Sequence, residues 1–220
     1  MTLSEIISLT RGRLRDPHPG TYWSDNELIV MLNDTIDEFC RETLLLEDSL
    51  TPEICSIPVV EGQAYYELDS RIIFVARVYL AGYCPLGKVN RCDLDAWYER
   101  WEVDQDRPRA YISDLESQQI RLYPVPDDNY QLALTVFRIP LIPMTMKEPD
   151  RQPEINSRHH YSLIDGLVAR AYQTNDSDTF EPNFYQLHAA KWRDYIEKIK
   201  QEMLRTRRTE TICKPYAGNL

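Results

Sequence analysis

Carboxylates are the side chains that could most readily do chemistry in this chain, because it holds 35 Asp and Glu residues. A pair of carboxyl groups can act as general acid and general base, for example in glycoside hydrolysis. No spacing singles out such a pair, and carboxylates that are close in sequence usually belong to a solvated face. The GxSxG and HExxH motifs and the GK[ST] end of a phosphate-binding loop are missing from the sequence. We therefore predict that the chain is not an enzyme and binds no cofactor.

Cysteine and histidine could hold a metal ion if four of them converged. His159 and His160 are adjacent, but no cysteine lies within fifty residues of them. An odd number of cysteines without a C-x-x-C pair is typical of free thiols in a reducing compartment. We predict no metal site and no disulfide among the five cysteines, which are Cys40, Cys55, Cys84, Cys92 and Cys213.

Three aromatic residues, Trp97, Tyr98 and Trp101, could form a platform for a sugar or a base. Trp and Tyr are also enriched in protein cores and in subunit contacts. We favour the core or contact interpretation, because no other sign of a ligand accompanies these residues.

Charge is distributed unevenly along the chain. Residues 191–220 hold eight Lys or Arg and four Asp or Glu, a net charge of +4, whereas the other 190 residues hold 17 and 31, a net charge of −14. Binding to phosphates needs Lys and Arg, so the acidic body is a poor general nucleic-acid binder. The basic C-terminus could instead dock on an acidic surface. No apolar run approaches the ~20 residues of a membrane span.

Two helices are predicted at the start of the chain. Thr2 and Glu5 have the spacing of a capping box and indicate the start of the first, which the prolines and glycine of residues 16–20 end. Residues 23–28 give a stronger signal, a capping box flanked by a hydrophobic staple, and an apolar stripe follows to about Leu46. Four residues should fix this second helix start: Trp23, Ser24, Glu27 and Leu28.

The apolar period changes from helical to β at Ile54. Residues 54–60 and 63–68 read as a hairpin around Glu61-Gly62, with Pro58 indicating an edge strand. We expect a short helix over 92–101. Further strands, in a sheet of about six, are predicted over 71–80, 109–113, 119–123 and 130–138.

Two more helices are predicted after a proline-containing linker at 139–156. The third spans about 157–172, and Gly166 within it suggests a close helix contact. A turn at 175–178 separates it from the fourth, which has Pro182 in its first turn. The apolar face of the third is predicted to be Tyr161, Ile164, Val168 and Ala171, and that of the fourth Tyr185, Trp192, Ile196, Ile199 and Met203.

The predicted fold class is therefore α+β, a four-helix bundle with a β-sheet or β-sandwich domain inserted between helices two and three. The bundle is assigned to 1–53 and 154–205, the inserted β domain to 54–153, and an extended C-terminal arm to 206–220. Basic and apolar residues in and beside the arm are the candidate docking residues: Arg205, Arg207, Arg208, Lys214, Tyr216 and Leu220.

Several segments resemble bacteriophage head-to-tail adaptor (connector) proteins. Residues 22–28, Tyr-Trp-Ser-Asp-Asn-Glu-Leu, with Leu-Asn-Asp at 32–34, are similar to the family's opening pattern W-[ST]-D-x-E-L followed by L-N. The middle of the chain is similar to P-x-x-Y, L-Y-P-x-P and Y-x-L, at residues 108–111, 122–126 and 130–132. Ala-Arg-Ala-Tyr at 169–172, before a long aromatic helix, also fits the family. The order and spacing of these pieces carry the resemblance, which covers most of the chain.

The resemblance implies a virion structural protein located in the neck at the head–tail junction and assembled in the host cytoplasm. Such adaptors form a ring, usually of twelve copies, below the portal. The ring extends the DNA channel and offers a platform to the tail, nozzle or tail-fibre proteins. DNA would pass without sequence-specific binding, and acidic walls would let it slide; the acidity could equally serve solubility alone. The implied partners are other copies of the chain, the portal and tail proteins, with no membrane and with the basic arm docked on the portal.

Two other classes of function remain open from the sequence. One is a cell-wall hydrolase carried in the virion, which would need a cleft with carboxyl groups of perturbed pKa. The other is a DNA-packaging accessory factor, which would need a basic face that this chain offers only at its C-terminus.

Overall fold

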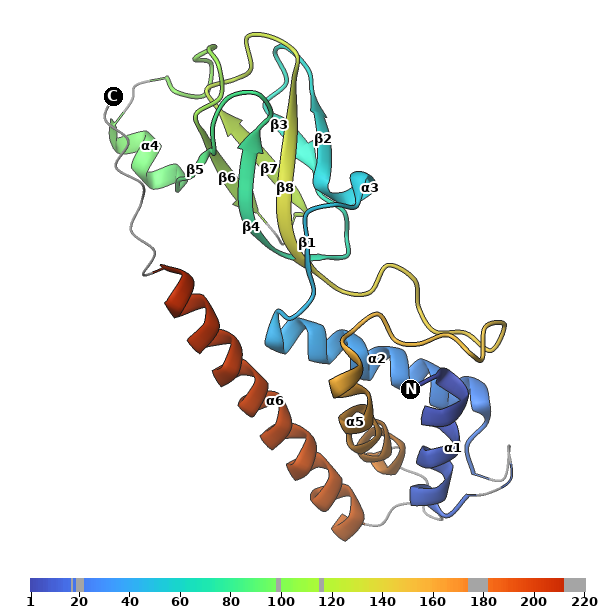
Figure 1. Ribbon diagram of the computed structural model, residues 1–220. Helices are drawn as coiled ribbons and strands as arrows, with labels where there is room; N and C mark the ends of the chain where they lie inside the picture. The colour runs from blue at the N-terminus through green and yellow to red at the C-terminus, as the bar shows by residue number, and fades with distance from the viewer. Residues whose placement is uncertain (17, 19–21, 98–99, 115–116, 174–181, 212–220) are drawn as a thin grey trace. The chain divides into compact units, whose positions relative to one another are not determined.

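The computed structural model divides the chain into two compact units, which we describe separately (Figure 1). The helical unit comprises Met1–Leu45 and Pro140–Leu220, and the β unit comprises Leu46–Ile139. The class is α+β, as predicted, with six α-helices and two sheets among the described residues. The structure describes residues 1–16, 18, 22–97, 100–114, 117–173 and 182–211.

The helical unit begins with α1 (Leu3–Leu14) and α2 (Asp25–Thr43). Both predicted capping boxes are present. The hydroxyls of Thr2 and Ser24 each accept a hydrogen bond from the backbone N–H three residues on, and the glutamate there accepts one from the cap residue's N–H. α2 ends three residues before the predicted Leu46 and buries the expected stripe of Leu28, Leu32, Ile36, Phe39 and Thr43.

The other helices of this unit are η1 (Ser157–His159), α5 (His160–Gln173) and α6 (Pro182–Thr211). α5 contacts α1, α2 and α6, and Figure 1 shows it between α1 and α6. The prediction that Tyr161 belongs to the buried face of α5 is wrong, because this side chain is 60% exposed. The buried face is made instead by His160, Leu163, Ile164, Leu167, Val168 and Ala171.

Gly166 is the point at which α5 lies closest to its neighbours. A Cβ atom there would lie 2.6 Å from Cγ2 of Thr35 in α2 and 2.9 Å from the ring of Trp192 in α6. The predicted close helix contact at this glycine is therefore confirmed.

The segment between Ile139 and Asn156, predicted as a linker, lies beside α1 and α2 and forms no helix or strand. Its carbonyl groups at Arg151 and Pro149 accept hydrogen bonds from the N–H groups of Leu3 and Ser4, at 2.8 and 3.0 Å. These N–H groups lie in the first turn of α1 and have no partner within the helix. The late segment of the chain thus completes the start of the first helix.

The α6 helix corrects the predicted C-terminal arm. The helix continues to Thr211, so the prediction of an extended arm from residue 206 is wrong for residues 206–211. The apolar stripe ends near Met203, but Leu, Arg and Glu remain good helix formers, and no Gly or Pro occurs before Pro215. Residues 212–220 and the predicted turn at 175–178 lie outside the described residues.

The β unit holds two four-stranded sheets. In the first, β8 (Tyr130–Arg138) pairs antiparallel with β4 (Ile72–Leu80) and with two short strands, β1 (Glu47–Asp48) and β2 (Ser56–Val59). The strand order of the second is β3 (Tyr65–Glu67), β7 (Gln119–Tyr123), β6 (Ala110–Asp114) and β5 (Gly87–Lys88).

The predicted hairpin across Glu61-Gly62 is wrong. Its two halves contain β2 and β3, but β2 pairs with β8 and β3 pairs with β7, in different sheets. The sheets hold eight strands instead of the predicted six or so, because the two-residue strands β1 and β5 have no period to detect. Pro58 does lie in an edge strand, as predicted, since β2 is at the end of its sheet order.

Two helices accompany the sheets, α3 (Pro52–Cys55), which was not predicted, and α4 (Arg91–Trp97), which is shorter than the predicted 92–101. Leu94, Trp101 and Ile112 form a buried cluster beside α4. The largest fully buried side chains of the sheets are Leu80, Ile120, Leu122, Leu132 and Leu134.

Candidate functional site

The residues predicted to start α2 all have structural partners. Trp23 is buried and meets the ring of Tyr172 edge-on, with 6.1 Å between centroids. Ser24 Oγ accepts a hydrogen bond from the Glu27 N–H at 3.2 Å, and the Glu27 carboxylate accepts one from the Ser24 N–H at 2.7 Å. These bonds to Ser24 lower the pKa of the Glu27 carboxyl group, and Leu28 is fully buried. Their role as determinants of the fold stays a prediction.

A buried arginine that the sequence did not reveal fixes the connection between α1 and α2. Arg11 Nη1 donates to the Asp16 carboxylate at 2.9 Å, and Nη2 donates to Asp25 at 2.6 Å and to the Trp23 carbonyl at 3.0 Å. Arg11 is only 6% exposed, so its charge depends on these partners. Asp16 and Asp25 follow Arg11 by five and fourteen residues and lie beyond the end of α1, so no periodic pattern in the sequence indicates these bonds.

A histidine–carboxylate pair lies between α5 and α6. Asp165 accepts hydrogen bonds from His188 Nδ1 at 2.8 Å and from Arg13 of α1 at 2.6 Å. A catalytic triad would add a hydroxyl or thiol bonded to the other ring nitrogen. Within the described ranges, no Ser, Thr or Cys makes that bond to His188. The pair therefore joins three helices.

His159 and His160 point to different partners and do not converge. His159 Nδ1 bonds to the Tyr195 hydroxyl at 2.8 Å, and its Nε2 accepts from Arg158. His160 bonds to the N-terminal amine of Met1 and to the Ile155 carbonyl. Among the described residues, no group of three or more His, Cys, Asp and Glu is placed to hold a metal ion.

The most buried ion pair of the β unit joins Asp48 and Arg138. Asp48 accepts from Arg138 Nε at 2.5 Å and from the Thr51 hydroxyl at 2.6 Å. Burial opposes ionisation of Asp48, but hydrogen bonds from Thr51, from the Leu50 N–H and from Arg138 outweigh it and hold the pKa well below its usual range. Burial, with the nearby Asp48 charge, raises the pKa of the Cys55 thiol to about 11, so this cysteine is not an activated nucleophile.

Trp101, one of the three candidate platform residues, is part of the core. It is 5% exposed, and its Nε1 donates to Asp95 at 2.8 Å. The guanidinium of Arg121 lies 4.0 Å from the centroid of the Trp101 ring. A ring covered in this way offers no face to a ligand; Tyr98 and the side chain of Trp97 lie outside the described residues.

The candidate docking residues are divided by the end of the described chain. Arg205 is exposed on α6, whereas Arg207 donates from Nη2 to the carbonyl of Leu44, beyond the end of α2, at 2.8 Å. Arg207 therefore has a structural partner in its own helical unit. The side chain of Arg208 and all of Lys214, Tyr216 and Leu220 lie outside the described residues.

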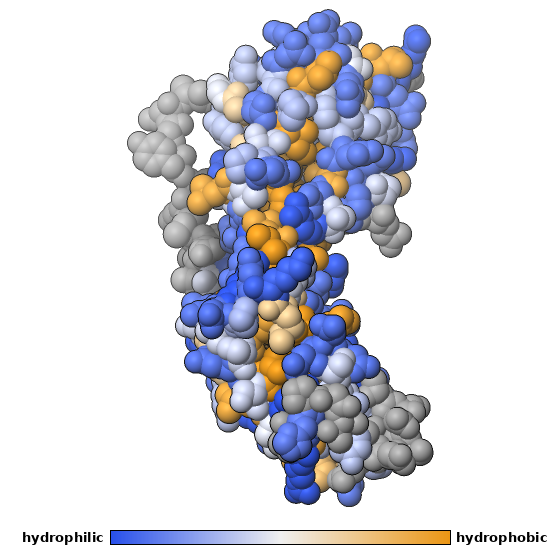
Figure 2. Space-filling model, turned by 90° about the vertical axis from the view of Figure 1, so that its right-hand side faces the viewer, coloured by the Kyte–Doolittle hydropathy of each residue, from blue (hydrophilic) through white to orange (hydrophobic). Residues whose placement is uncertain are grey.

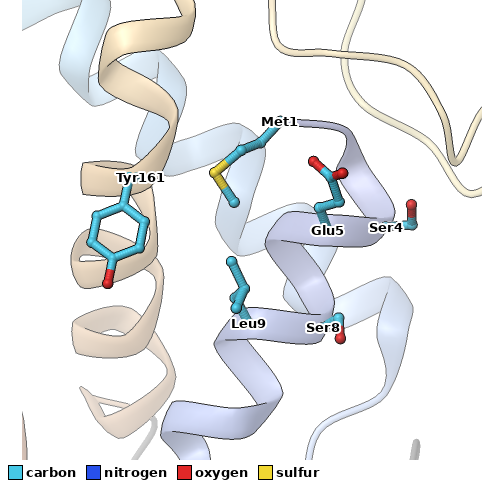
Figure 3. A pocket seen from close by; sticks show the side chains of 6 residues that line it. All are labelled: Met1, Ser4, Glu5, Ser8, Leu9 and Tyr161. Carbon is cyan, nitrogen blue, oxygen red and sulfur yellow. The ribbon is translucent and has the colours of Figure 1, made fainter.

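The outer face of α1 carries two grooves. Figure 2 shows hydrophobic surface in patches between hydrophilic side chains. One groove lies between α1 and α5, where Met1 and Leu9 face Tyr161 across the gap (Figure 3). The other lies between α1 and the 140–156 segment, and its walls include Met146 and Pro149. Leu9, Tyr161 and Met146 are 46%, 60% and 47% exposed.

Comparison with known protein families gives a match that covers nearly the whole chain. Residues 1–213 match the family model described as SU10 adaptor protein. The chain belongs to this family of phage head-to-tail adaptors, which are structural proteins of the bacteriophage head–tail connector. No curated protein matches the chain. Among the residues that the structure describes, no helix is both long and apolar enough to cross a bilayer.

Proposed function

We propose that the chain is one subunit of a ring, of about twelve copies, in the neck of the virion below the portal. The observation that carries this proposal is the adaptor-family match over residues 1–213. The ring extends the DNA channel and gives the tail or nozzle its attachment platform. This role requires no catalytic site, since the subunit acts by presenting surfaces.

In this proposal the helical unit acts as a four-helix bundle of α1, α2, α5 and α6 and forms the wall of the ring. The support is that α5 contacts the three other helices and that polar bonds, such as those of Asp165 to Arg13 and His188, join them. The β unit, which interrupts the bundle between α2 and α5, meets tail-side proteins or neighbouring subunits. An insertion of this kind can vary without breaking the bundle.

The C-terminal end of the chain docks the subunit on the portal. Its support is the charge contrast: residues 191–220 carry a net +4 and the rest of the chain −14. A basic peptide can lie along an acidic groove or add a strand to an exposed sheet edge. Tyr216 and Leu220 are the apolar anchors of this arm, and Arg205, Arg208 and Lys214 supply its charge.

Electron microscopy of purified neck complexes tests the ring directly. We expect about twelve copies of the chain between the portal and the tail, assembled in the host cytoplasm and retained in the virion. A complex with one or two copies would contradict the proposal. A zymogram without a clearing band would separate this role from that of a cell-wall hydrolase, and weak, non-specific DNA binding would separate it from that of a packaging factor.

Truncation after Thr211 tests the docking arm. It removes Lys214, Tyr216 and Leu220 and leaves all of α6, including the bond of Arg207 to Leu44, in place. We expect the truncated subunit to fold, to fail to join portal-bearing heads, and to leave those heads leaking DNA. Normal occupancy on portals would contradict the docking role.

A further inference from the structure

A pocket opens in the β unit beside α4, at the ends of β5, β6 and β7. Figure 1 shows α4 next to β5 and β6. The volume of the pocket is about 360 Å³, within the range of about 300–1,000 Å³ that is usual for ligand sites. Its apolar floor is formed by Val89, Leu94, Ala110, Tyr123 and Pro124. Leu94 belongs to the buried cluster beside α4, and Val89 and Tyr123 pack against that cluster, so the pocket opens onto the core.

Backbone hydrogen bonds hold one side of the rim in place. The Val125 N–H donates to the Asp104 carbonyl at 2.9 Å, and the Asp106 N–H donates to the Val125 carbonyl at 3.0 Å. The Arg109 N–H donates to the Tyr123 carbonyl at 2.8 Å, which anchors the chain where it enters β6. The pocket is therefore formed before any partner arrives, and a preformed site lowers the entropic cost of binding.

Three charged side chains line the pocket, and two of them are paired with each other. Asp106 and Arg109 form a salt bridge, and the Arg107 N–H donates to the Asp106 carboxylate at 2.7 Å. The bond from Arg107 and the charge of Arg109 lower the pKa of the Asp106 carboxyl group. Asp104, the third, is exposed, and within the described ranges no Lys or Arg forms a salt bridge with its carboxylate. The lining therefore carries one negative charge in excess.

Two nearby arginines contact other groups and leave this charge in place. The guanidinium of Arg107 lies 5.0 Å from the centroid of the Tyr83 ring, which is not part of the pocket. The guanidinium of Arg121 lies 4.0 Å from the centroid of the Trp101 ring, within the core. The carboxylate of Asp104 is thus the charged group of the lining that is open to a partner.

An arginine side chain matches the chemistry of this pocket. Its aliphatic stem can cover an apolar floor while its charged end stays at the surface. The planar guanidinium can donate two N–H groups to one carboxylate and can stack on an aromatic ring. Asp104 and Tyr123 supply both groups in the same lining. Arginine is also enriched in protein interfaces, unlike lysine.

Charge distinguishes the possible sources of such an arginine. Residues 1–190 of this chain carry a net charge of −14, and an acidic rim disfavours an acidic partner surface, so the body of a second copy is poorly suited. The segment with a net positive charge, residues 191–220, is the one that we propose to dock on the portal. A different protein with a basic surface fits the pocket better.

We infer that the pocket beside α4 receives an arginine side chain from a positively charged surface of a tail-side protein. The inference rests on the proposed role of the β unit in meeting tail-side proteins, and it specifies where that contact is made. The stem of the arginine lies on the apolar floor, and its guanidinium pairs with Asp104.

Nuclear magnetic resonance of the 220-residue chain tests the pocket without the partner. The probe is N-acetyl-arginine amide, and the matched probe is N-acetyl-citrulline amide, which has nearly the same shape and no charge. We expect saturable shifts of the backbone resonances of Leu94, Ala110 and Tyr123 with the arginine probe only. Equal binding of the two probes, or no saturable shift at these residues, would overturn the inference.

Two carboxylate-to-amide variants serve as test and control in the same experiment. Asp104→Asn should weaken binding of the arginine probe at least ~3-fold, as for an ion pair at a surface rim. Glu61→Gln removes the same charge at another exposed position of the β unit, outside the pocket, and should leave binding unchanged. Equal affinity of Asp104→Asn and wild type would also overturn the inference.

Charge reversal in phage particles tests the partner. Asp104→Arg should leave the ring in place and lower the fraction of heads that carry a tail at least ~10-fold, because like charges would then meet in the contact. Asp104→Asn, which adds no atom, should give a smaller loss in the same direction. Glu61→Arg is the control and should keep its tails. Both positions are exposed, so the urea midpoint of the isolated chain should not change.

Electron microscopy of these particles separates the inference from the proposed function. Asp104→Arg particles with a ring and a normal number of tails would remove the pocket contact and leave the adaptor role intact. Asp104→Arg particles that lose the ring would place a second copy in the pocket, which also overturns the inference. Wild-type particles that contain no ring would instead refute the proposed function.

Discussion

Replacing Gly166 by alanine should destabilise the helical unit by about 2 kcal/mol. Alanine gains about 1 kcal/mol over glycine inside a helix, while overpacking of a core costs about 1–3 kcal/mol. The new methyl group would lie 2.6 Å from Thr35 Cγ2 and 2.9 Å from the Trp192 ring. Trp192 cannot move away easily, because it is 5% exposed and its Nε1 donates to Glu38 at 3.1 Å. We therefore place the overpacking cost at the upper end of its range.

Replacing Gly12 by alanine should instead stabilise the helical unit. No atom lies within 4 Å of a Cβ at that position, so Gly12→Ala keeps the helix-propensity gain of about 1 kcal/mol and meets no steric cost. The two variants add the same methyl group to helices of the same unit. Their difference of about 3 kcal/mol therefore measures how tightly the three helices meet at Gly166.

Urea unfolding followed by circular dichroism at 222 nm is the suitable assay, because most of the helix is in the helical unit. The two units need not unfold together, so the midpoint of the helical transition is compared, at unchanged slope. Thr35→Ser removes Cγ2 and keeps the hydroxyl that donates to the Met31 carbonyl. In combination with Gly166→Ala it should recover part of the loss. A Gly166→Ala variant as stable as wild type would show that this helix contact is not tight.

Four further outcomes are expected. Ser24→Ala should cost about 1 kcal/mol of stability in urea unfolding and leave assembly unchanged; loss of assembly at unchanged stability would show a direct role. Asp48→Asn should cost about 3–5 kcal/mol, because it removes one partner of a buried ion pair. Since the pKa of Asp48 is lowered in the fold, its contribution is complete above pH ~4 and is lost as the pH falls below that value. Burial and the charge of Arg158 lower the pKa of His159 to about 4, so the unfolded chain takes up this proton at a higher pH than the folded chain. Stability should therefore fall as the pH drops from ~6.5 towards 4. A His159→Gln variant whose stability declines equally steeply would exclude His159 as the cause. Arg207→Ala should cost about 1 kcal/mol through loss of the bond to the end of α2, read by the same unfolding assay.

Local signals in the sequence predicted local structure well. The bounds of β7 and β8 agree with the predicted strands, and both capping boxes are present at the starts of α1 and α2. These features depend on neighbouring residues: a period of two, a turn, or a hydroxyl and a carboxylate three residues apart. The adaptor family was also predicted correctly, because its motifs are carried by the same local segments.

Pairings between distant segments could not be predicted in this way. β2 and β3 looked like a hairpin because only a short turn separates them, yet each pairs with a strand more than fifty residues further on. Alternation shows that a segment is a strand but not which strand it joins. The Arg11 network was missed because it joins α1 to a loop and to the next helix. The end of α6 was misplaced because the apolar stripe stops before the helix does.

The way in which the chain completes α1 has a consequence for the order of events during synthesis. The first N–H groups of this helix bond to carbonyl groups at Pro149 and Arg151, and α5 and α6 come later still. The β unit, in contrast, is one continuous segment, Leu46–Ile139. Domains generally fold as their residues leave the ribosome. The β unit can therefore form on the ribosome, while the helical unit waits for the last third of the chain.

The ring-forming surfaces that we propose for the helical unit would thus be complete only on release from the ribosome. Neighbouring nascent chains on one messenger RNA, held close together, would carry a folded β unit and an incomplete helical unit. Until then, the apolar surface of the incomplete helical unit stays exposed and is prone to aggregate. For the ring that we propose, the discontinuous helical unit would restrict assembly to chains that include the last third of the sequence.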